Sequence, residues 1–175
     1  MTPARDNPSG IRLLAPLLIL PGTALVLVPA LIIWLTHGTR LQAELASPGD
    51  WRLWLAIAFG CVGLVLAIWT CRLFVTEGEG SPAPWDPPQK LVVRGPYRHV
   101  RNPMISCVLF LLGAEALIFT SWALAGWWLV FFLGNALYLP LREEKGLERR
   151  FGEPYLQYKA HVHRWFPRLR PWRQP

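Results

Sequence analysis

The decapeptide RGPYRHVRNP, residues 94–103, holds three arginines, two prolines and a glycine directly before a long apolar run. Gly95 and Pro96 favour a tight turn, and Pro103 disfavours a helical conformation at Asn102. A rigid turn with exposed N–H groups beside arginines is suited to a carboxylate or another anion. Arginines that simply meet lipid phosphates would give the same charge. The proline and glycine favour the ligand site, because a lipid belt requires no shaped turn.

Carboxylates form a second candidate group. Glu143 and Glu144 directly follow a later apolar run. If one of them faces the arginine-rich turn, it would pair with an arginine or attract a cationic ligand group. The alternative is that both lie on a solvated helix face with i,i+4 ion pairs. Glu115 is the only charged residue within residues 105–141. It is a functional candidate as an intramembrane carboxylate, or else it lies near an interface.

The composition indicates a membrane protein. Of 175 residues, 53% are hydrophobic, ten are tryptophan and only 17% are charged, against roughly 25% in soluble domains. The net charge of +7 collects beside apolar runs, which favours a membrane and not a nucleic acid as partner. Cys61, Cys71 and Cys107 lack zinc-ligand spacing, so no metal site is expected.

Three apolar runs predict the elements that position these residues. Residues 13–35 carry no charge, residues 53–71 form a second run, and residues 105–141 are long enough for a helical hairpin with its turn within residues 120–126. Prolines at Pro16, Pro21 and Pro29 predict kinks. The expected fold is an all-α integral membrane protein with about four transmembrane helices, the last two forming the hairpin.

The segments outside these runs complete the expected organisation. Residues 77–90 are rich in proline and glycine and predict a stiff connector. The polar tail predicts an extension of the fourth helix, a break near residues 152–154, and an amphipathic helix along the membrane surface. Residues 1–76 would form an N-terminal helix pair. Residues 77–175 would hold the ligand loop, the hairpin and the tail, within one membrane domain.

The distribution of basic residues predicts the topology. With four spans, both termini and the second loop share one side, which holds 16 of the 18 Lys and Arg residues. That side is expected to be cytoplasmic. The compact chain is typical of a protein of the bacterial inner membrane.

The motif GPYRHVRNPM, followed some 40 residues later by EE and then by FGEPYLQY, resembles the superfamily of isoprenylcysteine carboxyl methyltransferases and phospholipid methyltransferases. The resemblance covers roughly residues 77–167. It implies an integral membrane enzyme that uses S-adenosylmethionine and binds it with a cytoplasmic loop. The cofactor-binding residues that it implies are Gln89, Lys90, Leu91, Val92, Tyr97, Asn102, Pro103, Met104, Ile105 and Glu143. We place Arg101 and Glu144 beside them as candidate catalytic residues.

Three positions depart from the superfamily pattern. Asn102 and Ile105 stand where those enzymes have His and Tyr. Those enzymes also have an arginine that contacts the substrate, four residues before the Glu that contacts the cofactor. The corresponding residue here is Leu139. Asparagine keeps a hydrogen-bonding side chain, so cofactor binding can survive. The leucine argues against a prenylated cysteine carboxylate as substrate.

The expected activity is methyl transfer from S-adenosylmethionine to a hydrophobic or lipid-like acceptor at the cytoplasmic face. Two alternatives remain open: a non-catalytic binding or assembly protein on the same scaffold, and a nicotinamide-dependent membrane reductase. The expected partners are the bilayer and a hydrophobic small molecule or lipid, with no nucleic acid. The apolar first helix offers a surface for a homo-oligomer.

Overall fold

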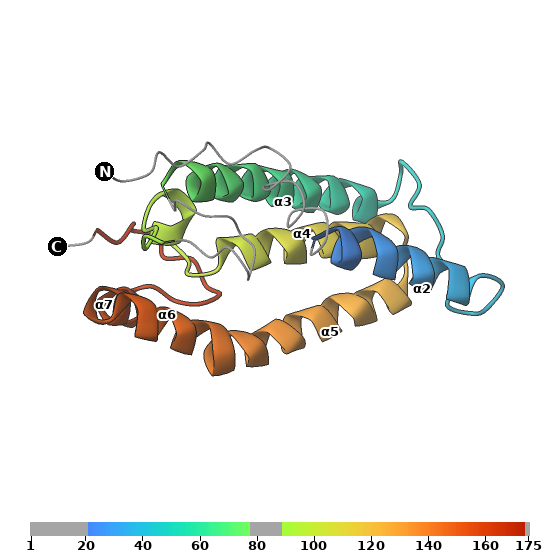
Figure 1. Ribbon diagram of the computed structural model, residues 1–175. Coiled ribbons are helices and arrows are strands. Elements are labelled where there is room, and N and C mark those ends of the chain that lie inside the picture. The colour runs from blue at the N-terminus through green and yellow to red at the C-terminus, as the bar shows by residue number, and fades with distance from the viewer. Residues whose placement is uncertain (1–20, 78–88, 174–175) are drawn as a thin grey trace, which may run out of the picture.

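The computed structural model describes residues 21–77 and 89–173, and within these ranges every regular element is a helix (Figure 1). The elements are, in chain order, η1 (Thr23–Leu27), α2 (Val28–Thr36), α3 (Trp51–Thr76), η2 (Gly95–Arg98), α4 (Pro103–Ile118), α5 (Trp122–Tyr138), η3 (Leu139–Glu143), α6 (Glu144–Phe151) and α7 (Glu153–His161). The predicted all-α class is therefore confirmed for the described residues.

The helices run up and down beside one another. α3 packs along α4, α4 along α5, and α2 against α5 (Figure 1). One end of the bundle holds residues 36–51 and 119–121, and we call it the hairpin end. The opposite end holds residues 89–103 and 144–173, and we call it the polar end. The two candidate groups from the sequence, the arginine-rich turn and the carboxylate pair, both lie at the polar end.

Glycines allow α3 and α4 to approach closely. A Cβ at Gly63 would lie 2.8 Å from Cγ of Leu111 and 3.1 Å from the carbonyl oxygen of Cys107. A Cβ at Gly113 would lie 3.0 Å from the ring of Phe59. Small residues at helix contacts are the usual means of packing helices in a membrane, where apolar attraction between helices is weak. This contact fixes where α4 begins, and hence where the turn before it sits.

Two π-helical segments accompany prolines. The N–H of Val28 donates to the carbonyl of Thr23, just before Pro29, and the N–H of Glu144 donates to the carbonyl of Leu139, beside Pro140. Proline has no N–H for the regular i→i−4 ladder, so a neighbouring wide turn accommodates the missing bond. The second segment, η3, joins α5 to α6 and sets the directions of the carboxylates that follow.

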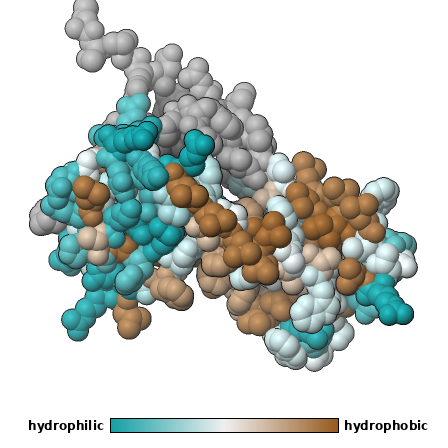
Figure 2. Space-filling view, turned by 90° about the horizontal axis from the view of Figure 1, so that it is seen from below, coloured by the Kyte–Doolittle hydropathy of each residue, from teal (hydrophilic) through white to brown (hydrophobic). Residues whose placement is uncertain are grey.

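Much of the outer surface is apolar. Two helices, Trp51–Leu73 and Trp122–Phe151, are long and apolar enough to cross a membrane, and Thr23–Thr36 and Pro103–Ile118 are shorter apolar helices. Figure 2 shows hydrophilic residues gathered over the α6–α7 end and hydrophobic residues over the opposite half of the same face. Large side chains such as Trp54, Leu64 and Leu133 are exposed on the outer surface of the helices. Water would disfavour this surface, whereas lipid would match it.

The predicted boundaries can be compared with the observed ones. The hairpin turn falls at Phe119–Ser121, where Thr120 has a φ of 39°, so the expected turn is confirmed. The tail breaks at Gly152, whose φ is 59°, also as predicted. α3 extends beyond the predicted run at both ends, and at its C-terminal end no proline or glycine stops the helix between residues 64 and 76. The predictions for Pro16 and for most of the 77–90 connector lie outside the described residues.

Candidate functional site

The arginine-rich turn begins with a short 3₁₀ helix, η2. Gly95 opens it with a φ of 52°, a conformation that favours glycine. A Cβ at this position would lie 2.8 Å from Nε1 of Trp69 on α3. The turn is therefore seated directly on α3, and glycine is required both for the backbone conformation and for the close contact.

Tyr97 anchors the turn in the protein. Its ring is buried with Leu73 and Val92, and its carbonyl accepts a 2.7 Å hydrogen bond from the hydroxyl of Tyr158 on α7. Burial raises the pKa of the Tyr97 hydroxyl well above its ordinary value, and the carboxyl group of Glu143 adds a smaller effect in the same direction. Tyr97 and Glu143 thus lie close enough to interact electrostatically, although they are far apart in the sequence.

The C-terminal segment, residues 162–173, is bound along the same turn. The N–H of Arg101 donates to His163 O at 2.9 Å, and the N–H of Arg168 donates to His99 O at 2.9 Å. Further along, the N–H of Trp172 donates to the carbonyl of Arg98 at 3.0 Å. These bonds run between backbone groups, so they hold the turn regardless of side-chain identity.

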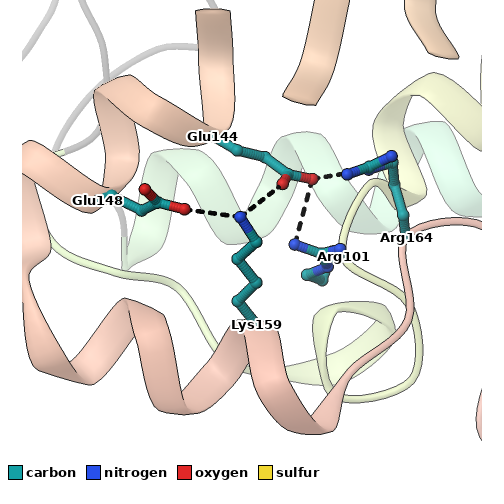
Figure 3. A network of polar contacts seen from close by, with 5 residues as sticks. All are labelled: Arg101, Glu144, Glu148, Lys159 and Arg164. Atoms are coloured by element: carbon teal, nitrogen blue, oxygen red, sulfur yellow. Dashed lines mark hydrogen bonds and ion pairs between the residues drawn. The ribbon is translucent and has the colours of Figure 1, made fainter. Parts of the chain in front are cut away.

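Glu144 lies at the centre of an ionic cluster (Figure 3). Its Oε1 is 3.1 Å from NH1 of Arg101 and 2.7 Å from Nε of Arg164, and its Oε2 is 3.2 Å from Nζ of Lys159. Lys159 also contacts Glu148 at 2.6 Å. The hydrogen bond to Glu148 is the main cause that raises the pKa of Lys159, and the bond to Glu144 raises the pKa of Arg164.

This cluster confirms that one of the two adjacent carboxylates meets an arginine of the turn. Only 4% of the Glu144 side chain and 10% of the Arg101 side chain are exposed. Three cations and two carboxylates leave one positive charge in surplus. Buried ion pairs are stable only when further hydrogen bonds satisfy their remaining groups.

Among the residues that the structure describes, two buried donors beside this cluster have neither a hydrogen bond nor an ion pair. They are Nε of Arg101 and Nδ2 of Asn102. NH1 of Arg101 is in the ion pair with Glu144 but is not aligned as a hydrogen bond. Asn102 is the N-cap residue of α4, yet its side chain forms no cap bond. Unpaired buried donors are costly, and their position at the start of a helix is favourable for an anion.

The other predicted cofactor residues surround this point at different depths. Gln89 and Lys90 are exposed, Leu91 packs against the cluster of Tyr155, Tyr158, Val162 and Trp172, and Val92 is buried with Tyr97. Pro103 is buried at the first position of α4, and Met104 and Ile105 follow it, half-buried. Glu143 is exposed on η3. The set is thus grouped at the polar end, and the assignment of these residues to a cofactor stays a prediction.

Glu115 belongs to a different place. It lies in the last turn of α4, about 18 Å along the helix from Pro103 at 1.5 Å per residue. Its Oε2 is buried and has no hydrogen-bond partner within residues 21–77 and 89–173. It is therefore not part of the group around Arg101.

The sequence did not single out Lys159 and Arg164. Both come from the tail, 15 and 20 residues after Glu144, in a segment that holds many basic residues. The available signal was the spacing of Tyr155 and Tyr158, which marks the buried face of α7. Lys159 follows Tyr155 by four residues, so its side chain starts from the same face of the helix.

The described residues thus form an apolar helical bundle whose polar end carries a buried ionic cluster and buried donors. A family model described as phospholipid methyltransferase matches residues 51–154, from the first residue of α3 to the second residue of α7. The chain belongs to this family. No curated protein and no solved structure gave a match.

Family membership confirms the resemblance read from the sequence, which is to the isoprenylcysteine and phospholipid methyltransferase group. It indicates a methyltransferase that acts on a lipid-like substrate in a membrane. The matched region contains Arg101, Glu143 and Glu144. It ends before Lys159 and Arg164, so those two cations lie outside the part that the family model describes.

Proposed function

We propose that this protein transfers a methyl group from S-adenosylmethionine to a lipid-like acceptor at its polar end, on the cytoplasmic face of the membrane. The observation that carries the proposal is the pair of buried, unpaired donors on Arg101 and Asn102, within a chain of the phospholipid methyltransferase family. The excess of basic residues at this end supports the cytoplasmic orientation.

The residues present fit the chemistry of this cofactor. S-adenosylmethionine carries a carboxylate, an amino group and a sulfonium. Nε of Arg101 and Nδ2 of Asn102 would hold the carboxylate, because both are buried donors that lack a partner. Glu143, an exposed carboxylate within electrostatic reach of Tyr97, would attract the cationic part.

When bound, the cofactor supplies an electrophilic methyl group on a sulfonium. Methyl transfer requires in-line alignment, so the residues act mainly by binding and orientation. Glu144 holds the guanidinium of Arg101 in place, and the backbone bond from Arg101 to His163 fixes its Cα. Glu144 is thus a positioning residue in this proposal. A general base is needed only if the acceptor carries a proton on its nucleophilic atom.

The acceptor would approach from the bilayer along α5 and η3. Leu137, Tyr138 and Leu141 are exposed immediately before Glu143, and they form an apolar surface that leads to it. Leu139 between them is buried, with 1% of its surface exposed, so no cation is available at that position. The structure therefore favours a lipid-like acceptor without the carboxylate of a prenylated cysteine.

The same proposal includes the finer topology. Four spans, with Thr23–Thr36 and Pro103–Ile118 as the shorter two, would place both termini with the polar end in the cytoplasm. A bacterial inner membrane suits this arrangement, and the exposed face of α2, including Leu31 and Trp34, would be open to a second copy of the chain.

Calorimetric titration of S-adenosylhomocysteine into the detergent-purified protein tests the proposal. We expect binding to the wild type, weaker binding to Glu143→Gln and unchanged binding to Glu153→Gln, a matched exposed carboxylate on α7. A parallel titration with NADPH tests the reductase alternative. The lack of any binding by folded wild-type protein, or equal affinity in both variants, would refute the assigned site.

One observation favours a second candidate, a binding or assembly protein without catalysis. Ile105 and Leu139 replace polar residues of the superfamily pattern, and Leu139 is fully integrated into the core. Incorporation of a labelled methyl group into a total lipid extract distinguishes the two candidates. Cofactor binding without any labelled product would favour this second candidate.

A further inference from the structure

The hairpin end of the bundle holds a polar cavity of about 250 Å³, at the opposite end from the Glu144 cluster. Its lining includes Arg40, Gln42, Glu44, Arg52, Thr120 and Trp122. These residues come from the loop after α2, the start of α3 and the hairpin turn. None of them belongs to the site described above.

Hydrogen bonds join the segments that surround the cavity. The N–H of Glu44 donates to the carbonyl of Phe119 at 3.0 Å, and the N–H of Ala46 donates to that of Ile118 at 2.7 Å. The hydroxyl of Thr120 donates to the carbonyl of Glu44 at 2.8 Å. Thr120 has a φ of 39°, which a β-branched residue rarely adopts. Strained residues of this kind persist where the surroundings hold them, and they are frequent at binding sites.

The charges in the cavity have an unusual distribution. Only 2 of the 18 basic residues, Arg40 and Arg52, lie between the first two apolar runs, and both line this one cavity. The nearest carboxylate oxygen of Asp50 is 4.0 Å from Arg52, which is the limit of an ion pair. The guanidinium groups therefore retain donors for an anion, and Glu44 supplies a carboxylate beside them.

Tryptophans place the cavity at the depth of lipid headgroups. Trp34 ends α2, Trp51 and Trp54 begin α3, and Trp122 begins α5, so all four lie at the hairpin end. Each is well exposed, and Trp122, which lines the cavity, has 81% of its surface exposed. Exposed tryptophans at helix ends are typical of the membrane–water interface.

We propose that this cavity binds the headgroup of a zwitterionic membrane phospholipid. Arg40 and Arg52 would hold the phosphate, Glu44 would face the ammonium group, and the acyl chains would extend along the exposed apolar helices. The bound lipid would be distinct from the methyl acceptor, because the bundle separates the cavity from the polar end. The inference does not depend on the proposed reaction.

The test uses a phosphatidylethanolamine that carries a photoreactive group near its headgroup, with the full chain in detergent micelles. Labelled peptides are mapped by mass spectrometry after irradiation. We expect labelling within residues 37–54 and 119–123. The yield there should fall at least about tenfold in Arg40→Gln/Arg52→Gln, because both phosphate-binding groups are removed. It should be unchanged in Arg149→Gln/Arg173→Gln, which removes two exposed arginines from the polar end.

Competition identifies the ligand. Unlabelled phosphatidylethanolamine should displace the probe, whereas diacylglycerol, which lacks the phosphate, should not. The Arg40→Lys/Arg52→Lys variant keeps the charge and should retain part of the labelling, so that it guards against a folding defect. If millimolar inorganic phosphate alone displaced the probe, the cavity would be a site for a free anion and not for a lipid headgroup. This result would overturn the proposal. Equal labelling of wild type and Arg40→Gln/Arg52→Gln would also overturn it.

Discussion

The substitution Arg101→Gln tests the central feature of the proposed cofactor site. It removes a guanidinium that forms an ion pair with Glu144. The buried Nε of this guanidinium has no hydrogen-bond partner among the described residues. If that Nε binds the cofactor carboxylate, one charge-assisted hydrogen bond is lost. Such bonds contribute about 1.5–3 kcal/mol, so the dissociation constant should rise roughly 10- to 150-fold.

The expected effect on folding is smaller than for an ordinary buried ion pair. Removing one partner of an isolated buried pair costs about 3–5 kcal/mol, because the other charge is left uncompensated. Glu144 would still contact Arg164 at 2.7 Å and Lys159 at 3.2 Å. We therefore expect a loss of about 1–2 kcal/mol in the free energy of unfolding, with the fold retained.

Arg164→Gln is the matched control. It also removes one cation from Glu144, but Arg164 has no unpaired buried nitrogen and belongs to the C-terminal segment. Calorimetric titration with S-adenosylhomocysteine gives the affinity, and thermal unfolding in the same detergent gives the stability. Both variants should lose similar stability, and only Arg101→Gln should lose affinity. Equal affinities in the two variants would show that Arg101 has only a structural role.

Three further substitutions test how the fold supports this site. Gly95→Ala should lower thermal stability and cofactor affinity, because the new Cβ meets an indole and the φ is positive. Gly146→Ala, in open space within α6, should leave the affinity unchanged and should not lower the stability, because alanine is the better helix former. Tyr158→Phe should lower the free energy of unfolding by about 1–3 kcal/mol, because a buried carbonyl loses its donor; denaturant titration measures this. Gly63→Val should separate α3 from α4 and reduce the yield of monodisperse protein in size-exclusion chromatography. The control is Gly134→Val, because a Cβ at Gly134 has no neighbour within 4 Å. Equal yields of the two variants would contradict the close packing.

The helical membrane class and the outline of the fold could be predicted from the sequence. Long apolar runs have few structural solutions in lipid, because every backbone polar group must be bonded within the segment. The hairpin turn near Thr120 and the break at Gly152 were predictable for a similar local reason, since each follows a change in polarity or a glycine. The family motif likewise consists of short segments, each of which can be recognised in the sequence without knowledge of the fold.

The composition of the ionic cluster was only partly predictable. The sequence left open whether a carboxylate of the pair would face the arginine-rich turn or lie on a solvated helix face, and it named Arg101 and Glu144 together as candidates. It did not identify which further groups would join them. Lys159 and Arg164 reach Glu144 only because α7 and the C-terminal segment fold back along the turn, through backbone bonds such as that from Arg101 to His163.

The apolar helices, their breaks and the residue types that could bind a charged ligand follow from local polarity and backbone preferences, so the amino-acid order was enough to predict them. The burial of Glu144 and the exposure of Glu143 depend instead on packing between distant segments. Adjacent helical residues point about 100° apart, and the π-helical turn beside Pro140 alters the register of both. Their roles therefore depend on how the start of α6 meets the arginine-rich turn through the ion pair of Glu144 with Arg101, and this contact joins segments about 40 residues apart.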